Sequence, residues 1–220
     1  ARWTDEDGRA RSPASFIAVA EESGLILPLG RWAIDEAVRT LAAWDQRAGG
    51  DCGVSMSVNL SAIQLQRDAV APIVAAALDL HGVPGRRLRL ELTESALVSE
   101  PERIARVLHA LKELGATIAM DDFGTGYSNL VYLQKLPIDI LKIDRSFVTG
   151  MLADRDKVAI VRAVLGLAAA LNMDTVAEGI EADEVGQTLA ALGCTYGQGY
   201  AYAPPLEADK AYSLLRERNN

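Results

Sequence analysis

Residues 116–122 read Ala116-Thr117-Ile118-Ala119-Met120-Asp121-Asp122, an apolar run that ends in two adjacent carboxylates. Residues 116–120 of this stretch have the length and composition of a buried β-strand, and the two carboxylates stand at its end. Comparable runs recur between helical stretches, at about residues 54–60, 87–92, 138–143, 174–177 and 194–200. This repeated βα order predicts parallel strands covered by helices, arranged either as an open doubly wound sheet or as a closed barrel.

The polar residues that follow the strands distinguish these two topologies. They stand at or near the carboxyl ends of six successive predicted strands, and they are Asn59, Glu91, Asp121, Asp122, Lys142, Glu178 and Gln198. A closed barrel brings all of its strand ends to one face. A doubly wound sheet would form its site from two or three strand ends, usually with a glycine-rich phosphate loop, and the sequence has no such loop. We therefore predict an α/β protein with a TIM-like (β/α)8 barrel.

The first 50 residues predict helices rather than strands. Ser12-Pro13 is a typical helix start for residues 14–22, and residues 27–47 predict a second helix. The second helix has an apolar stripe that we expect to lie in the core, and its members are Trp32, Ile34, Ala37, Leu41 and Trp44. A barrel of this type needs two strands more than the chain supplies. We therefore expect one domain, 1–220, that lacks the first strand or two and is N-terminally incomplete.

Composition limits the partners of the protein. Half of the chain, 50%, is hydrophobic, and the formal net charge is −8. This charge repels polyanions, so we expect no contact with duplex nucleic acid or with a membrane. The sequence has no signal-like N-terminus and no run of about 18 apolar residues. Cys52 and Cys194 lie outside any metal-ligand spacing, which favours a reducing, cytoplasmic location.

Asp121 and Asp122 are the strongest indication of chemistry. Two adjacent carboxylates repel one another unless a cation lies between or beside them. One carboxylate can bridge two divalent ions about 4 Å apart while its neighbour binds one of them, which suits in-line phosphoryl displacement. The competing interpretation is that Asp122 caps a helix that begins near Tyr127. Asp122-Phe123-Gly124 also matches the magnesium motif of protein kinases, but the other kinase motifs are missing.

Three further strand-end residues have two interpretations each. Glu91 faces the barrel axis, either as a metal ligand or as the partner of Arg89 in an internal salt bridge. Lys142 either positions a water or a phosphate oxygen, or is a structural countercharge to Asp144 or Asp122. Glu178 either binds metal or acts as a base.

Longer motifs make the chain resemble a known family. They occur in order along the whole sequence, and they are Arg2-Trp3, Pro13 to Ile17, Val58-Asn59-Leu60-Ser61, Glu91-Leu92-Thr93-Glu94-Ser95, Asp121 to Ser128, Leu141-Lys142-Ile143-Asp144, Ala177-Glu178-Gly179-Ile180-Glu181 and Gln198-Gly199-Tyr200. On these motifs the chain resembles the EAL domains, barrel phosphodiesterases that linearise the bacterial second messenger cyclic di-GMP. The Glu-Ala-Leu signature of the family would lie immediately before Ala1.

The resemblance implies a site for two Mg²⁺ or Mn²⁺ ions. The first ion would be bound by Asn59, Glu91 and Asp121. The second would be bound by Asp121, which bridges the two ions, together with Asp122 and Glu178. A water between the ions would attack phosphorus, and whether Glu178 is a base or only a ligand stays open.

The resemblance also implies roles around the metals. Lys142 would orient the attacking water or stabilise developing charge. The remaining roles are substrate contact for Arg2 and Gln198, support of the Asp122 to Ser128 loop for Glu94, and general polar support for Asp144 and Glu181.

The activity that the resemblance implies is hydrolysis of cyclic di-GMP to linear pGpG. It also implies a homodimer formed through helices near the Asp122 to Ser128 loop, and sensory or diguanylate-cyclase-like domains upstream. One alternative is a receptor that binds cyclic di-GMP without hydrolysis, although such a receptor does not need the full set of carboxylates. Another is a purely structural interaction domain, but burying this many carboxylates would be costly without metals.

Overall fold

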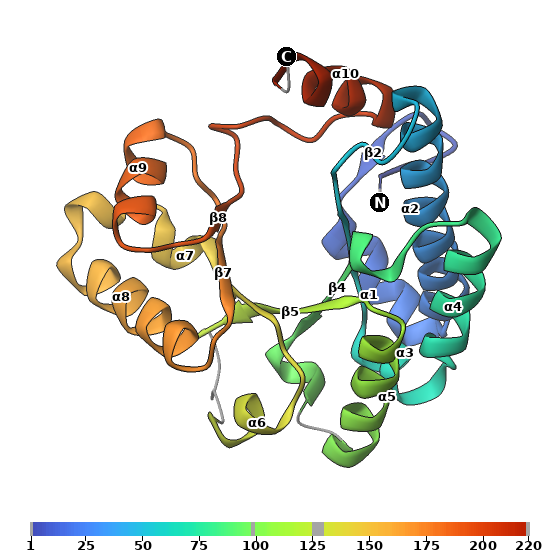
Figure 1. Ribbon diagram of the computed structural model, residues 1–220, viewed down its shortest axis with the longest axis horizontal. Helices are drawn as coiled ribbons and strands as arrows, with labels where there is room; N and C mark the ends of the chain where they lie inside the picture. Colours follow the sequence, from blue (N-terminus) through green and yellow to red (C-terminus); the bar gives the residue numbers. More distant parts are fainter. Residues whose placement is uncertain (1, 98–99, 125–129, 219–220) are drawn as a thin grey trace. The chain divides into compact units, whose positions relative to one another are not determined.

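The structure is a computed structural model that describes residues 2–97, 100–124 and 130–218 (Figure 1). The chain consists of two compact units, Ala1–Thr117 and Ile118–Asn220. In both units, parallel strands alternate with helices, which confirms the predicted α/β class. No helix among the described residues has both the length and the apolar character needed to cross a bilayer.

The first unit begins with a small antiparallel hairpin that the sequence did not predict. Its elements are β1 (Trp3–Thr4), β2 (Ala10–Arg11), α1 (Pro13–Ser23), α2 (Ile26–Ala48), β3 (Met56–Asn59), α3 (Ala62–Arg67), α4 (Val70–His81), η1 (Gly85–Arg87), β4 (Leu88–Thr93), η2 (Glu94–Leu97) and α5 (Pro101–Glu113). The hairpin turn is held by Asp5, whose carboxylate accepts hydrogen bonds from the Arg9 backbone N–H and from Arg11 Nε. Such a short hairpin has too few residues to show strand periodicity in the sequence.

The core of the first unit lies between its helices and the parallel pair β3 and β4. Figure 1 shows α2 running beside α4, and α2 also packs on β3. On β4, Leu88, Leu90 and Leu92 are fully buried, as the period of two predicts for residues that face the helices. The expected core stripe of α2 is wrong at one position, because Trp32 is 52% exposed whereas Ile34 is 1% exposed. Two helical residues turn about 200°, so Trp32 projects from the opposite face.

The second unit continues the βα alternation in four parallel strands. Its elements are β5 (Thr117–Phe123), α6 (Leu130–Lys135), β6 (Ile140–Ile143), α7 (Arg145–Val148), η3 (Met151–Ala153), α8 (Arg155–Ala170), β7 (Asp174–Ala177), α9 (Asp183–Ala191), β8 (Tyr196–Gly197) and α10 (Ala208–Arg218). Strand β5 pairs with β6, β6 with β7, and β7 with β8. Helix α8 packs on β6 and β7 (Figure 1).

Most predicted boundaries hold to within two or three residues, and two strands differ in an informative way. Strand β8 has two residues instead of the predicted run 194–200, and β5 extends through both aspartates to Phe123. The helix ends follow their local signals: Pro13 is at the start of α1, and Gly115 and Gly193 adopt positive φ values of 87° and 93° just after α5 and α9.

Candidate metal-binding site

Asp121 and Asp122 share one side of β5 because the strand contains a bulge. Met120 is opposite Leu141 on β6 and Phe123 is opposite Ile143, so the two aspartates stand opposite the single residue Lys142. Successive side chains of a regular strand point to opposite faces, whereas a bulge adds a residue and rotates the chain locally. Bulges are rare in parallel pairs and frequent beside active sites.

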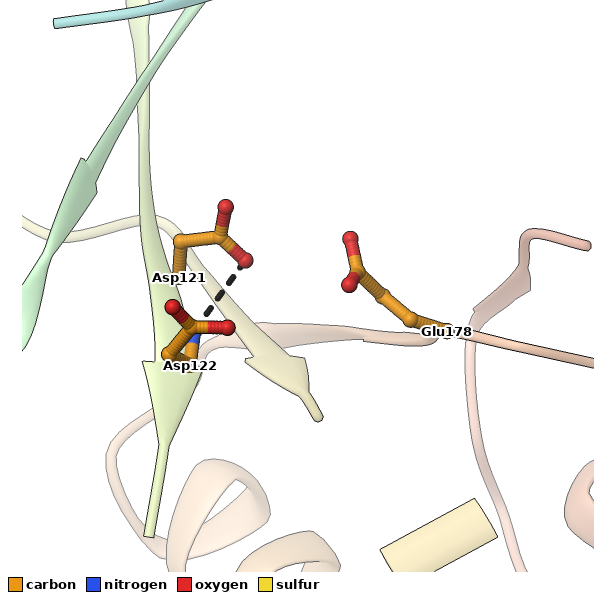
Figure 2. A group of neighbouring side chains, drawn as sticks. All are labelled: Asp121, Asp122 and Glu178. Atoms are coloured by element: carbon orange, nitrogen blue, oxygen red, sulfur yellow. Dashed lines mark hydrogen bonds between the residues drawn. The ribbon is translucent and has the colours of Figure 1, made fainter. Parts of the chain in front are cut away.

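The backbone of Asp122 has an unusual conformation at the bulge. Its φ is 55°, in the left-handed region that aspartate tolerates better than most residues, at a cost of about 1–2 kcal/mol. Its N–H donates to Asp121 Oδ1 at 3.0 Å, which orients the Asp121 carboxylate relative to the Asp122 backbone (Figure 2). Asp122 lies inside β5. Residues 125–129, where the sequence places the start of a helix near Tyr127, lie outside the described residues, so the N-cap interpretation of Asp122 stays a prediction.

Glu178 reaches the two aspartates from the end of β7. Figure 2 shows its carboxylate directed toward theirs, and one oxygen of each of the three residues lies within 4.8 Å of the others. The Glu178 N–H donates to the Ile143 carbonyl at 3.0 Å, which places the residue at the carboxyl ends of β6 and β7. Gly179 follows with φ 71°, and a Cβ on it would lie 2.6 Å from Arg145 Cβ. The glycine therefore lets this turn pass close to α7.

Lys142 lies among these carboxylates. Its Nζ is 3.0 Å from Asp121 Oδ1 and 2.6 Å from Glu178 Oε1, and the lysine side chain is only 4% exposed. The two carboxylates compensate the buried ammonium. Removal of the ammonium, or of the carboxylates, would leave a buried charge without compensation, which is costly. The sequence left Lys142 as either a water-positioning group or a countercharge, and this geometry is compatible with both roles.

The electrostatics of the group fit a divalent cation. Burial raises the pKa of the Asp122 carboxyl, and the charges of Asp121 and Asp144 raise it further, while Lys142 opposes them. Mg²⁺ binds oxygen at about 2.1 Å, so two of its ligands are at most about 4.2 Å apart. Three carboxylate oxygens within 4.8 Å of one another need only small side-chain movements to reach that spacing. The donor set consists of hard oxygens, which Mg²⁺ and Mn²⁺ prefer.

Asn59 and Glu91 form a second pair, in the first unit. They are opposite each other in the β3–β4 register, and the Leu60 N–H donates to the Glu91 carbonyl at 2.7 Å. Glu91 is 5% exposed and Asn59 is exposed. The structure thus brings together Asn59 with Glu91, and separately Asp121, Asp122, Lys142 and Glu178. A single site that joins both sets remains a prediction.

The other predicted site residues have defined local positions. Arg2 is exposed just before β1, Glu94 begins η2, and Glu181 is exposed two residues before α9. Asp144 is the N-cap of α7, where its carboxylate accepts the Ser146 N–H at 2.9 Å. The Gln198 backbone flanks the Glu178 turn: its N–H donates to the Ala177 carbonyl and its carbonyl accepts the Ile180 N–H. Residues 125–128 of the predicted Asp122 to Ser128 loop lie outside the described residues.

Comparison with known proteins identifies the family. A family model described as "EAL domain" matches residues 1–205. The chain belongs to the EAL domain family. The resemblance seen in the sequence motifs is thereby confirmed.

The curated relatives that this EAL domain matches are longer than the chain. It is 38% identical over 209 residues to the bifunctional diguanylate cyclase/cyclic di-GMP phosphodiesterase MucR of Pseudomonas aeruginosa, which is 95% of this chain and 30% of MucR. It is 35% identical over 215 residues to the cyclic di-GMP phosphodiesterase PA2567 of the same species, which is 98% of this chain and 36% of that protein. The chain spans between 25% and 36% of the length of the first curated relatives it matches.

A solved structure confirms the fold class. The structure described as "PaMucR Phosphodiesterase, c-di-GMP complex" superimposes with a TM-score of 0.89 at 38% identity, covering 96% of this chain and 84% of that one. EAL domains are TIM-like barrels, so the predicted barrel class is confirmed.

Two local features were missed by sequence reasoning. The bulge in β5 depends on pairing with β6, and no residue pattern within 116–123 predicts it. Gln64, in contrast, had a visible signal, because Ser61 followed three residues later by glutamine is the pattern of a helix capping box.

Proposed function

We propose that residues 1–220 form an EAL-type phosphodiesterase domain that hydrolyses cyclic di-GMP to linear pGpG with two divalent ions, Mg²⁺ or Mn²⁺. The observation that supports this most directly is the carboxylate group of Asp121, Asp122 and Glu178 around Lys142. MucR and PA2567 are named as cyclic di-GMP phosphodiesterases, and this similarity supports the choice of substrate.

The proposed ligand sets are those that the family resemblance implies. Asn59, Glu91 and Asp121 would hold one ion, and Asp121, Asp122 and Glu178 would hold the other. When bound, two such ions neutralise phosphate charge and make an attacking water more acidic. Asp121 is suited to bridge them because the bulge presents it and Asp122 on one side of β5.

Further predicted site residues would act on the substrate and on the attacking water. Lys142 would orient the attacking water from its buried position between Asp121 and Glu178. Arg2 and Gln198 would contact the dinucleotide. The proposed supporting residues are Glu94, Asp144 and Glu181.

Incubation of the purified protein with cyclic di-GMP tests this proposal. With Mg²⁺ or Mn²⁺ we expect pGpG, separated by chromatography and identified by mass, and with a chelator we expect none. Production of pGpG at the same rate in excess chelator would contradict the metal requirement. Assembly is a separate proposal: a homodimer, within a longer protein that has further signalling domains, as the lengths of the relatives suggest.

A second candidate is a receptor that binds cyclic di-GMP without hydrolysing it. The observation that favours it is Lys142, which supplies a buried countercharge to both Asp121 and Glu178. Saturable binding of cyclic di-GMP with no pGpG after prolonged incubation in Mg²⁺ and in Mn²⁺ would support the receptor. Turnover would exclude it.

A further inference from the structure

The turn that follows Asn59 is held at two points. Asn59 is the last residue of β3, and Leu60 and Ser61 lead directly into α3. The Leu60 N–H donates to the Glu91 carbonyl at 2.7 Å, and the Ser61 N–H donates to Gln64 Oε1 at 3.1 Å. The two residues after Asn59 therefore have their backbone positions fixed, one by the neighbouring strand and one by a side chain.

Gln64 and Ser61 hold each other. The Gln64 N–H donates to Ser61 Oγ at 3.2 Å, so each side chain accepts the backbone N–H of the other residue. This reciprocal capping box satisfies two N–H groups that a helix start otherwise leaves without partners. In a helix of six residues, it fixes the direction in which α3 leaves β3.

Gly30 on α2 provides the space in which Gln64 lies. A Cβ at Gly30 would be 1.9 Å from Gln64 Nε2 and 2.4 Å from its Cδ. Gln64 is 2% exposed, and Leu65 beside it is fully buried. Glycine inside a helix is less favourable than alanine, and its lack of a side chain at this position admits the glutamine amide. The Gln64 side chain is thus held by the Ser61 N–H at its oxygen and by the close packing of Gly30 at its amide group.

We infer that Gln64, seated against Gly30, is a positioning residue for Asn59 as a metal ligand. This inference rests on the proposed function, in which Asn59 binds the first ion. A neutral amide ligand gains less than a carboxylate from long-range attraction to the cation, so its contribution depends strongly on where its oxygen is held. Loss of groups that orient metal ligands typically weakens metal affinity by about 10–100-fold.

The simpler role for Gln64 is to stabilise α3, and the two roles predict different measurements. Loss of a capping interaction lowers the melting temperature wherever the helix lies. A positioning role changes the affinity for Mg²⁺ or Mn²⁺ as well. Asp68→Asn is the matched control, because Asp68 is the C-cap of the same helix and pairs with Arg31, away from the Asn59 turn.

The test is calorimetric titration of Mn²⁺ into the protein without substrate, together with thermal melting. We expect Gln64→Ala to weaken Mn²⁺ binding about 10–100-fold. Gln64→Glu, which keeps an acceptor for the Ser61 N–H, should stay near the wild type. Gly30→Ala should resemble Gln64→Ala because its methyl group displaces the amide. Asp68→Asn should lower the melting temperature and leave Mn²⁺ affinity unchanged.

The double variant Gly30→Ala/Gln64→Ala is the internal check. If both residues act through one contact, its loss of affinity equals that of Gln64→Ala alone instead of the sum of the two single losses. It also keeps the test valid if Gln64→Ala folds poorly, because the added methyl group fills part of the vacated space. Additive losses would overturn the inference.

Asn59→Ala separates this inference from the proposed function. If Asn59→Ala leaves Mn²⁺ affinity unchanged, Asn59 is not a ligand and the proposed site itself is wrong. If Asn59→Ala weakens binding whereas Gln64→Ala and Gly30→Ala only lower the melting temperature, the site stands and the positioning role of Gln64 is overturned.

Discussion

The Nζ atom of Lys142 lies 2.6 Å from Glu178 Oε1, so an ion pair joins the ends of β6 and β7. The same ammonium lies 3.0 Å from Asp121 Oδ1 on β5. One side chain that is 4% exposed therefore connects the carboxyl ends of three consecutive strands. Any cation bound by these carboxylates must share them with Lys142, and this competition is the basis of the prediction for Lys142.

Asp121→Asn is expected to remove nearly all hydrolysis of cyclic di-GMP. The bridging position needs a charged oxygen for each ion, and an amide supplies neither the charge nor two equivalent oxygens. We expect turnover to fall about 10³-fold or more, the scale for loss of a principal electrostatic group. Product chromatography measures the loss, and circular dichroism checks that the fold is retained. Turnover close to the wild type at saturating Mg²⁺ would refute the bridging role.

Lys142→Met is expected to bind metal more tightly and to turn over substrate more slowly. Removing the ammonium frees the carboxylates for the cation and raises its affinity, while the attacking water loses the group that orients it. Without metal, the variant should also melt at a lower temperature, because Asp121 and Glu178 lose their countercharge.

The matched control is Lys157→Met, since Lys157 Nζ donates to the Thr149 carbonyl at the surface. It should change neither Mg²⁺ affinity nor turnover. If Lys142→Met melts at a lower temperature but its folded fraction has normal turnover, Lys142 is a structural countercharge and the proposed role in orienting water is wrong.

The sequence predicted the elements well where their signals are local. Alternating apolar runs located six strands, the asparagine and the acidic residues at their ends were identified, and the Ser12-Pro13 and glycine signals marked helix ends. These features depend on side-chain period and on backbone preference within a few residues. Such information is fully present in a single chain.

The features that sequence reasoning missed depend on pairing and packing. The bulge that sets Asp121 and Asp122 together arises from the register of β5 against β6. The hairpin of β1 and β2 depends on contacts of Asp5 with Arg9 and Arg11. Trp32 has the apolar character of a core residue but projects from the wrong face of α2. The bulge is thus decided by a strand distant in sequence, the hairpin by specific side-chain contacts across a short turn, and the exposure of Trp32 by its angular position on the helix.

Gly199→Ala is expected to damage the turn that carries Glu178. A Cβ at Gly199 would lie 2.1 Å from the Ile180 carbonyl oxygen and 2.4 Å from the Ile180 nitrogen, both of them backbone atoms. The turn must move, and with it the hydrogen bond from the Ile180 N–H to the Gln198 carbonyl. Overpacking of this kind costs about 1–3 kcal/mol. We expect a lower midpoint in urea unfolding and weaker metal binding.

Gly166→Ala is the control for this substitution. Gly166 lies inside α8, and a Cβ there would meet nothing within 4 Å. Alanine should raise the free energy of unfolding by up to about 1 kcal/mol through its higher helix propensity, which shifts the urea midpoint upward. Metal binding should stay unchanged. If Gly199→Ala behaves like Gly166→Ala, the close approach of residues 199 and 180 is not a constraint on the site.

The ion pair of Asp68 and Arg31 should give the first unit a defined acid sensitivity. Arg31 lowers the pKa of the Asp68 carboxyl through a hydrogen bond and through its charge, the Ala69 N–H lowers it further, and burial opposes them. Because the folded pKa lies below the unfolded value of about 3.9, the stabilisation is fully present above that pH. It is lost as the pH falls through the folded pKa.

Asp68→Asn should therefore melt below the wild type at pH 7, and this gap in melting temperature should close under acid conditions. Arg31 is 57% exposed, so salt should narrow the gap at pH 7 as well. Melting curves across pH at low and high salt measure both effects, and a gap that stays constant down to strongly acid pH would show that the charge of Asp68 does not stabilise the fold.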